Sequence, residues 1–350
     1  MREIHRILDA NFNRAREALR VAEDCGRFAL NDPAITMMAK NLRSDLREIL
    51  AAMPVQEMIT SRDTPGDIGT EITSPSEPLR ADLPDVATAA CKRLAEALRT
   101  IEEYGKIVAP DRVFQIERMR YNAYTLEARL VARLLVGRRF GEVRLYVLIG
   151  PGFGTGSIRE LARTAIAEGA GAIQLRTKNI SDAEMLAIAA ELRELTDETG
   201  RIFIVNDRPD VAAIVAADGV HLGQHDLPIA EARRLLRPGA IVGKSSHTIQ
   251  QARAAVTEGA DYVSVGPIFA TGTKDAGAPV GLELLKQAAR EISLPLVAIG
   301  GISAGNVAEV LAAGARCVAV CSAICAAEDP KAAAAAIARQ LAQAPPAAGC

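Results

Sequence analysis

Residues 201–226 read RIFIVNDRPDVAAIVAADGVHLGQHD. Two short apolar runs, Ile202–Val205 and Gly219–Leu222, each end in polar residues, and a helix-compatible segment separates them, which predicts a β-α-β unit of parallel strands. Because the carboxyl ends of parallel strands lie at one face, we expect Asp207 and Asp226 to lie close together. Paired carboxylates repel unless a cation joins them, and hard oxygen ligands suit Mg²⁺. The alternative is that both are solvated loop aspartates.

The same pattern continues on both sides of this unit, from Val143 to about residue 340. Eight apolar strand candidates alternate with helical intervals: Leu145–Ile149, Ala172–Arg176, Ile202–Val205, Gly219–Leu222, Ile241–Gly243, Tyr262–Val265, Leu296–Ile299 and Cys317–Val320. This alternation predicts an α/β fold, a (β/α)8 TIM barrel whose site lies at the carboxyl ends of the strands. An open doubly wound sheet is the competing fold, but no glycine fingerprint follows the first strand.

The first 138 residues differ, because they have helical periodicity and contain an internal repeat. Residues 13–28 align without a gap with residues 92–107, and the matched pairs are Arg14/Arg93, Glu17/Glu96, Ala18/Ala97, Leu19/Leu98, Arg20/Arg99, Glu23/Glu102 and Gly26/Gly105. Two copies predict a pseudo-symmetric all-α domain. A third helix, Arg112–Leu135, should close the bundle, and residues 136–141 should mark its boundary with the barrel.

Charged residues recur at spacings of three within each copy of the repeat, which places them along one helix face. Two interpretations stay open: a solvated, salt-bridged face, or a polar site. Between the copies lies the polar, glycine-bearing segment Thr60–Thr70, which is long enough to be a binding loop. It lacks the Walker phosphate-binding pattern and gives no nucleotide signal of its own.

Whole-chain composition narrows the classes of protein. The 350 residues are 49% hydrophobic with a net charge of -2, which suits two domains and gives no sign of nucleic-acid binding. We find no apolar run of membrane-spanning length and no signal-like segment after Met1, so we expect a cytoplasmic protein that does not bind a membrane. Cys317, Cys321 and Cys325 lie in an apolar strand and the following turn, so we interpret them as small hydrophobes rather than iron–sulfur ligands.

Polar residues follow the predicted strands. Gln174, Arg176 and Lys178 alternate, so they face one way on the second strand and its extension, where cations at a barrel mouth favour an anion. Ser245 follows the fifth strand and offers a hydroxyl to a phosphate. His247 is either a base or a packed histidine, and both interpretations stay open.

Loops near the last three strands also fit an anion. Residues 266–280, with two threonines and Lys274, form either a segment able to close over an anion or an ordinary loop. The glycines at 300 and 301 follow the seventh strand, and residues 321–323 follow the eighth. Loops in these positions often bind phosphate through backbone N–H groups, and glycine permits close approach.

These motifs resemble the thiamine-phosphate synthase family over residues 143–340. The matching segments are Gln174–Lys178, Asn206–Asp207, Ala217–Asp226, Ser245–Thr248, Gly266–Phe269 with Thr271–Lys274, and Ile299–Ile302. The resemblance implies a Mg²⁺-dependent transferase that joins 4-amino-2-methyl-5-(diphosphooxymethyl)pyrimidine to 4-methyl-5-(2-phosphoethyl)thiazole and releases pyrophosphate.

The resemblance also implies roles for individual residues. Substrate contacts on the pyrimidine diphosphate side would come from Gln174, Leu175, Arg176, Thr177, Lys178, Asn206, Ser245 and Lys274, with Arg176, Lys178, Ser245 and Lys274 assisting catalysis. The thiazole phosphate would meet Thr271, Gly272, Thr273, Gly301, Cys321 and Ser322, and Mg²⁺ would be held by Asp207 and Asp226. Thr177 and Ala270 depart from the family's usual Glu and Pro, and neither departure removes a charged ligand.

The helical region resembles a domain that is fused to this synthase in some bacteria and is assigned as a hydroxymethylpyrimidine-phosphate kinase. Asp9–Arg14, Glu17–Asp24 and Arg62–Asp63 carry the likeness. The resemblance implies ATP as a second substrate and a product that the barrel consumes. A non-catalytic dimerisation module is the alternative for this region.

Two alternatives for the barrel are a thiazole tautomerase with His247 as base and a Schiff-base aldolase using Lys244 or Lys274. We expect a helical domain over 1–138, a synthase domain over 142–341 and a disordered tail over 342–350. The expected partners are small-molecule substrates and further copies of the chain in a homo-oligomer.

Overall fold

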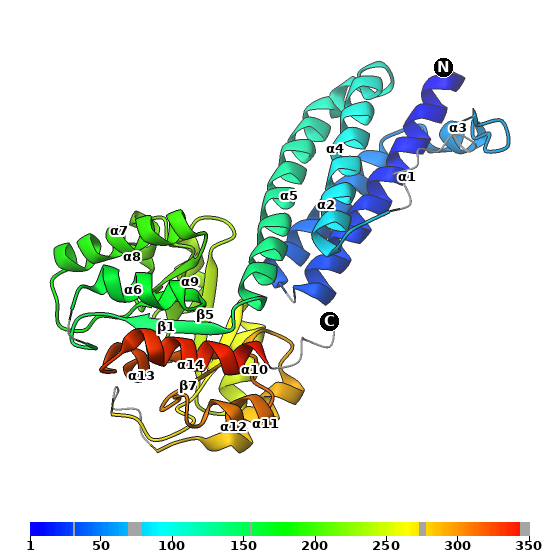
Figure 1. The fold of residues 1–350 in the computed structure, drawn as a ribbon. Coiled ribbons are helices and arrows are strands. Elements are labelled where there is room, and N and C mark those ends of the chain that lie inside the picture. Colours follow the sequence, from blue (N-terminus) through cyan, green and yellow to red (C-terminus); the bar gives the residue numbers. More distant parts are fainter. Residues whose placement is uncertain (31, 69–78, 155, 273–277, 344–350) are drawn as a thin grey trace. The chain divides into compact units, whose positions relative to one another are not determined.

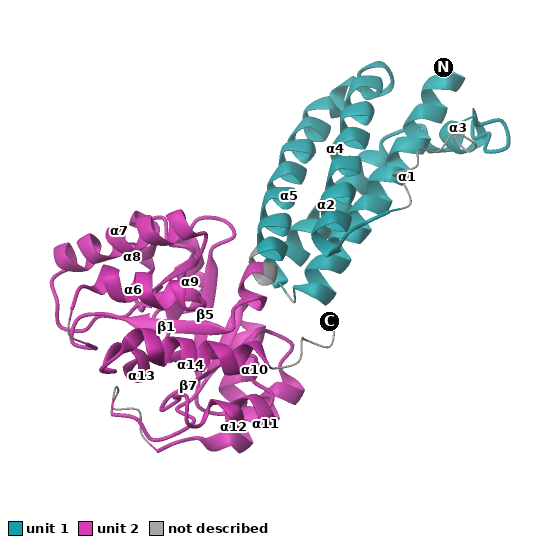
Figure 2. Cartoon of the chain, viewed as in Figure 1, with its two compact units in different colours: residues 1–135 teal, residues 136–350 magenta. Residues whose placement is uncertain are grey.

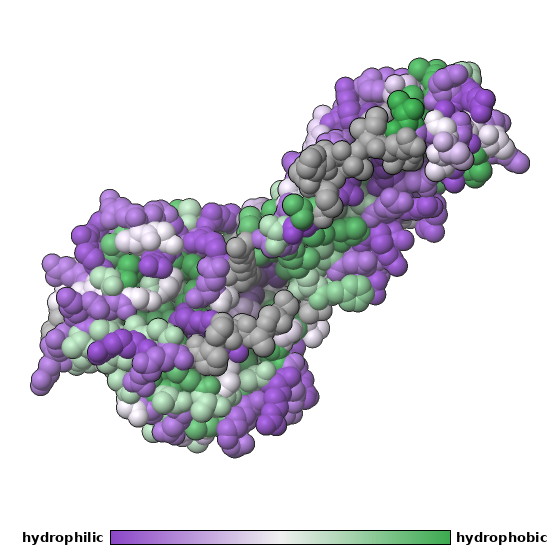
Figure 3. All heavy atoms as spheres, turned by 45° about the vertical axis from the view of Figure 1, so that its right-hand side comes forward, coloured by the Kyte–Doolittle hydropathy of each residue, from purple (hydrophilic) through white to green (hydrophobic). Residues whose placement is uncertain are grey.

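The computed structural model describes residues 1–30, 32–68, 79–154, 156–272 and 278–343. The chain forms two compact units, Met1–Leu135 and Val136–Cys350 (Figures 1 and 2). Hydrophilic residues occupy much of the visible surface in Figure 3, interrupted by smaller apolar areas. Within the described ranges, the search for a helix with the length and apolarity needed to cross a membrane finds none. Of the tail predicted over 342–350, residues 344–350 lie outside the described residues.

Unit 1 is built from helices and short helical turns (Figure 1). They are α1 (Arg2–Asp24), the π-helical turn η1 (Cys25–Ala29), α2 (Pro33–Ala51), α3 (Val55–Thr60), α4 (Leu83–Val108), the 3-10 turn η3 (Pro110–Arg112) and α5 (Val113–Gly141). An aspartate caps the amino terminus of each of two helices. Asp32 caps α2 by accepting from the N–H groups of Ala34 and Ile35, and Asp82 caps α4 by accepting from that of Asp85. The α5 helix continues to Gly141, so the prediction that this helix ends at Leu135 is wrong.

The two repeats form the centre of unit 1, because they lie on α1 and α4, which pack against each other. Leucines at helical spacing fill the contact, and Leu19 and its repeat partner Leu98 are fully buried. The apolar face of each repeat is therefore the core of the bundle.

Unit 2 is a closed barrel of eight parallel strands in chain order. The strands are β1 (Leu145–Ile149), β2 (Ala170–Leu175), β3 (Ile202–Asn206), β4 (Gly219–Leu222), β5 (Ile241–Ser246), β6 (Tyr262–Val265), β7 (Leu296–Ile299) and β8 (Cys317–Val320). The helices are α6 (Ile158–Ala167), α7 (Asp182–Thr199), α8 (Pro209–Ile214), α9 (Ile229–Leu235), α10 (Ile249–Thr257), α11 (Gly281–Glu291), α12 (Val307–Ala312), α13 (Ser322–Cys325) and α14 (Pro330–Ala342). The predicted (β/α)8 barrel after an all-α region is confirmed.

Alternation along the strands gives the barrel two apolar layers. Residues facing outward pack under the helices, whereas those facing inward fill the barrel itself. Phe140, from the end of α5, closes this inner core by stacking on Tyr262, with 4.0 Å between ring centroids. The inner layer is therefore packed with side chains and leaves the site to the strand ends.

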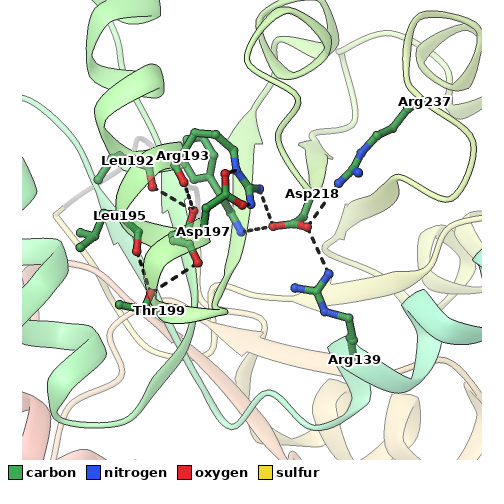
Figure 4. Close-up of polar contacts among 10 residues, drawn as sticks. Arg139, Leu192, Arg193, Leu195, Asp197, Thr199, Asp218 and Arg237 are labelled. Atoms are coloured by element: carbon green, nitrogen blue, oxygen red, sulfur yellow. Dashed lines mark hydrogen bonds and ion pairs between the residues drawn. The ribbon is translucent and has the colours of Figure 1, made fainter.

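Two buried aspartates hold the amino-terminal ends of the strands. Asp218, just before β4, accepts from Arg193 at 2.7 Å, from Arg139 at 3.2 Å and from Arg237 at 3.4 Å (Figure 4). Its carboxylate also accepts the backbone N–H of Phe203 at 2.9 Å. Asp261, just before β6, is likewise buried and accepts from Arg233 and from the Val242 N–H. These carboxylates are saturated by protein partners, so this end of the barrel supports stability.

Candidate functional site

A cavity of about 400 Å³ lies at the carboxyl ends of the strands. It is formed by β1 and by the segments that end β2, β5, β6, β7 and β8. Of the residues predicted for the site, those that line it are Arg176, Ser245, Thr271, Gly272, Gly301, Cys321 and Ser322. The fold thus gathers seven predicted residues from five strand ends into one concave surface.

Arg176 supplies the positive charge of this cavity. The residue follows β2 directly and is buried, and its backbone N–H donates to the Ile149 carbonyl at 2.8 Å. Its guanidinium lies over the Phe153 ring, 5.7 Å from the centroid. Within the described residues no carboxylate forms an ion pair with it. A buried cation without a protein counter-charge favours an anionic ligand.

Backbone from two loops forms the opposite wall of the cavity. The loop after β6 pairs with the end of β7, since the N–H groups of Ile268 and Phe269 donate to the carbonyls of Ile299 and Gly300. Gly300 has a φ of 99°, and a β-carbon there would lie 2.5 Å from the Pro267 Cα. Only glycine fits this approach, so the two loops meet and expose backbone to the cavity.

A chain of hydrogen bonds runs through the barrel to the cavity. The Gln174 Nε2 donates to the Tyr146 hydroxyl at 2.6 Å, which lies 3.1 Å from the Tyr262 hydroxyl. The Tyr262 hydroxyl lies 2.8 Å from His221 Nδ1, and His221 Nε2 lies 2.9 Å from Ser245 Oγ. Burial raises the pKa of both tyrosines, so both hydroxyls keep their protons.

The amide at one end gives this chain a direction. Because the Gln174 amide nitrogen can only donate, the Tyr146 hydroxyl accepts this hydrogen bond and donates its own to the Tyr262 hydroxyl. Tyr262 then donates to His221 Nδ1, and the protonated Nε2 donates to Ser245. The Ser245 hydroxyl proton is thereby left to point at an acceptor in the cavity, which suits a phosphate oxygen. His221, expected in the core or a supporting position, is buried and supports Ser245.

The two aspartates predicted to hold a metal lie at the ends of neighbouring strands. Asp207 directly follows β3, is exposed and has a φ of 64°. Asp226 follows β4, is partly buried and accepts the Gly223 N–H at 2.5 Å. Their oxygens are hard ligands of the type Mg²⁺ prefers, and neither residue lines the 400 Å³ cavity. In the described part of the chain, no cluster of three or more histidine, cysteine or acidic side chains could hold a metal.

The cysteines near β8 occupy different environments. Cys317 is buried inside the barrel, and burial raises its pKa to about 12. Cys321 lines the cavity, and a hydrogen bond with the Cys325 thiol lowers its pKa against the opposing effect of burial. The Cys325 Sγ also lies 3.3 Å from the Leu148 carbonyl oxygen. Cys321 is therefore the thiol of this group that a cavity ligand can reach.

Other predicted residues lie away from the cavity or outside the described ranges. The Leu175 side chain is buried under the helices, so only its backbone faces the strand end. Lys178 is exposed, and neither it nor Thr177 nor Asn206 lines the cavity. Thr273 and Lys274 lie outside the described residues.

The residues proposed for the alternative reactions are held by backbone groups. His247 lines the cavity, with its Nδ1 against the Gly266 carbonyl. The Lys244 ammonium donates to the Gly223 carbonyl at 2.9 Å and does not line the cavity. Lys244 is therefore poorly placed to form a Schiff base with a ligand in the cavity.

Sequence reasoning missed several contributors. Ser264 lines the cavity from within β6, and its hydroxyl lies 3.4 Å from His221 Nε2. Tyr146 and Tyr262 orient the hydrogen-bond chain, but each stands in an apolar strand and was indistinguishable from a core residue. The available signal was parity, since Tyr262 and Ser264 share an inward face with each other on β6.

Comparison with known proteins identifies the family. Residues 145–324 match the family model described as thiamine monophosphate synthase, and residues 6–129 match the ThiD2 family. The thiamine-phosphate synthase of Nostoc punctiforme is 42% identical over 327 residues, covering 93% of this chain and 91% of the relative. The chain belongs to the thiamine-phosphate synthase family. It is therefore a transferase of thiamine biosynthesis, as predicted.

Further relatives agree with this family assignment. The thiamine-phosphate synthase of Gloeobacter violaceus is 42% identical over 325 residues, covering 93% of each chain. The solved structure of thiamine phosphate pyrophosphorylase from Pyrococcus furiosus is 39% identical with a TM-score of 0.55. That likeness covers 59% of this chain and 98% of the other, so it concerns one part of this longer chain.

Proposed function

We propose that the barrel joins the pyrimidine diphosphate to the thiazole phosphate at the 400 Å³ cavity. The observation that carries this proposal is the buried Arg176, which faces the cavity without a carboxylate partner in the described residues. The Ser245 hydroxyl and the glycine-lined loop at Gly301 supply the neutral donors that a phosphate group also requires. In this proposal Arg176 and Ser245 hold the diphosphate, and Gly301, Cys321 and Ser322 meet the thiazole phosphate.

The proposed reaction needs no protein nucleophile. The bond between the pyrimidine methylene carbon and the diphosphate oxygen breaks, and its electron pair leaves with pyrophosphate. The electron-rich aminopyrimidine bears the resulting cation, and the thiazole nitrogen lone pair then forms the new C–N bond. Arg176 stabilises the charge that develops on the departing diphosphate, which is commonly the largest catalytic contribution.

Asp207 and Asp226 fit a Mg²⁺ ion by their donor chemistry and by their place on adjacent strand ends. When bound there, Mg²⁺ would neutralise charge on the diphosphate. We expect Asp207→Asn and Asp226→Asn each to abolish Mg²⁺-dependent coupling, measured as thiamine phosphate formed from the two preformed substrates. Full turnover by either variant in excess EDTA would contradict the metal assignment.

A variant at Arg176 tests the site itself. Arg176→Met keeps most of the side-chain volume but removes the charge, so kcat should fall by about 100-fold. Arg208→Met is a matched control, because Arg208 forms its ion pairs with Asp182 and Asp210 outside the cavity. If Arg176→Met retains the kcat of the unmodified chain, the cavity is not where the diphosphate departs.

We also propose that unit 1 phosphorylates hydroxymethylpyrimidine phosphate with ATP. The ThiD2 match and the likeness of Asp9–Arg14 support this, and the product would be the substrate of the barrel. The full chain should form thiamine phosphate from ATP, hydroxymethylpyrimidine phosphate and thiazole phosphate. If it does so only from the preformed diphosphate, unit 1 is a non-catalytic module such as a dimerisation domain.

The organisation of the protein in the cell is part of the same proposal. We place a kinase domain over 1–138 and a synthase domain over 142–341, working as a homo-oligomer in the cytoplasm. Cell fractionation tests the location, and light scattering on the purified full chain tests the oligomer. A monomer at working concentration would contradict the second point.

A further inference from the structure

Two sets of charged residues shared by the two repeats of unit 1 lie in different surroundings. The first set is buried: Glu23 is 1% exposed and Glu102 is 4% exposed. Arg43 of α2 forms an ion pair with Glu23, and Arg120 of α5 donates to Glu102 at 2.8 Å. Each buried carboxylate is thus neutralised by an arginine from the helix that follows it, so this set stabilises the bundle.

The second set lines an open cavity. Arg14 and Glu17 of α1 face Arg93 and Glu96 of α4 across a space of about 680 Å³, which we name the inter-repeat groove. All four side chains are exposed. The groove therefore takes its charged groups in equal number from the two copies of the repeat.

The groove has approximate two-fold symmetry. Arg14 and Arg93 are equivalent positions, as are Glu17 and Glu96, and so are the alanines Ala18 and Ala97 that also line it. When equivalent patches of two copies meet, the contact is isologous and a two-fold axis passes through it. Charges near the axis are consequently doubled, and a ligand there meets two arginines and two glutamates.

These four charged side chains differ from Glu23 and Glu102 in how they are paired. A spacing of three would permit ion pairs between Arg14 and Glu17 and between Arg93 and Glu96. In the described part of the chain, none of the four side chains forms an ion pair or a hydrogen bond. Arg80, which lies outside the repeats, also lines the groove, and its guanidinium donates to the Leu79 carbonyl at 2.6 Å. The salt-bridged-face interpretation of the repeat therefore applies to Glu23 and Glu102, and not to the groove.

A second cavity of unit 1 differs in this respect. It also measures about 680 Å³ and lies between α1, α2 and α3, with Arg16, Arg43 and Arg62 in its wall. Arg62 donates to both carboxylate oxygens of Asp9, each at 2.7 Å, and Arg16 donates to the Asn13 side chain at 2.9 Å. Arg43 is paired with Glu23. Because its only lining carboxylate, within the described residues, already holds Arg62, this cavity has no acidic group left for a metal.

We infer that the inter-repeat groove binds a magnesium-bound nucleoside triphosphate. Arginines bind phosphate oxygens, and carboxylates together with those oxygens complete the shell of Mg²⁺. A purely anionic ligand would be repelled by Glu17 and Glu96, whereas a polyphosphate carrying a divalent cation matches both kinds of charge. This inference rests on the proposed kinase function and assigns its nucleotide site.

Calorimetric titration of the full chain with ATP, with and without Mg²⁺, tests the inference. Arg14→Met and Arg93→Met should each weaken binding at least about tenfold in both conditions, because each removes a charge-assisted contact. Glu17→Gln and Glu96→Gln should remove the gain from Mg²⁺ while leaving metal-free binding equal or stronger. A purely structural role would not produce this opposite response to the metal.

The double variant Lys40→Met/Arg47→Met is the matched control, because both residues line the second cavity and neither lines the inter-repeat groove. It should bind Mg²⁺-ATP like the unmodified chain, and thermal unfolding should show that every variant is folded. If the control loses binding while the groove variants retain it, the nucleotide site is the second cavity. If the unmodified chain phosphorylates the pyrimidine but the groove variants bind normally, the groove assignment fails and the kinase stands. If the unmodified chain neither binds ATP nor phosphorylates, both fail.

Discussion

The barrel and the helical unit both separate the charges that stabilise them from the charges that remain available to a ligand. In the barrel the separation runs along the axis: Asp218 and Asp261 are saturated at the amino-terminal end, while Arg176 faces the cavity at the other. In the helical unit it runs around a helix, because Glu23 and Glu17 lie on the same α1, one buried and paired, the other exposed in the groove.

The difference shows how each architecture creates a concave surface. The barrel collects single residues from many strand ends. Its site is therefore asymmetric, and the residues that line it are arranged around the barrel in chain order. The helical unit instead presents the same segment twice, so its groove exists only when α1 packs against α4. A site of the second kind becomes visible in a sequence only if the repeat is recognised first.

The largest effect that tests this separation should come from Asp218. Asp218→Ala removes the acceptor of the buried Phe203 N–H and leaves Arg193 with Asp197 as its remaining carboxylate partner, which should destabilise the barrel by about 3 kcal/mol. Chemical denaturation should measure the loss of stability. Hydrogen exchange of the native protein should show weaker protection of β3 and β4, with α1 and α4 unaffected.

A partner on the surface supplies the control for Asp218. Arg237 is 56% exposed and lies 3.4 Å from the same carboxylate. Arg237→Ala should therefore cost less than about 1 kcal/mol. Equal losses in the two variants would show that the buried network is not what holds this end of the barrel.

Much of the fold was predictable because it depends on periodicity. The bounds of β1, β4, β6, β7 and β8 are those expected from the apolar runs. The prediction for the fifth strand stopped at Gly243, because the serines after it read as a loop. In the barrel, Ser245 and Ser246 continue the pairing with β6, so tertiary pairing overrides local polarity.

The site was only partly predictable. A sequence indicates which face of a strand a side chain lies on, but not whether that side chain reaches the cavity. Arg176 was predicted from its parity on the second strand and Ser245 from its place after the fifth, and both line the cavity. Arg176 directly follows β2, whereas Lys178 has the same parity but lies further along the loop, where alternation no longer sets its direction. Tyr146 and Tyr262 were missed because their hydroxyls meet partners that are 28 and 41 residues away in the chain.

A smaller effect, on kcat/KM, is expected from Tyr262, which connects the barrel core to the cavity. Tyr262→Phe removes the central hydroxyl of the hydrogen-bond chain. His221 Nδ1 then loses its donor, and with it the arrangement in which the protonated Nε2 orients Ser245. We expect kcat/KM for coupling to fall about tenfold, the value of one buried hydrogen bond. Phe140 should keep its contact with the remaining ring, so the fold should persist. Unchanged kcat/KM would mean that Ser245 is oriented without this chain.

The smallest effect compares the two repeats at one equivalent glycine. A β-carbon on Gly26 would lie 3.0 Å from Ile35 Cγ2 and 3.3 Å from the Thr36 backbone nitrogen, whereas one on Gly105 meets only Ile116 Cδ1 at 3.3 Å. Backbone cannot move aside as a side-chain tip can, so Gly26→Ala should destabilise unit 1 by about 1 kcal/mol or more. Gly105→Ala gains helix propensity worth up to about 1 kcal/mol against one movable contact, so it should be neutral or stabilising. Denaturation midpoints that shift in the same direction and by the same amount would mean that the repeats are equivalent in packing as well as in sequence.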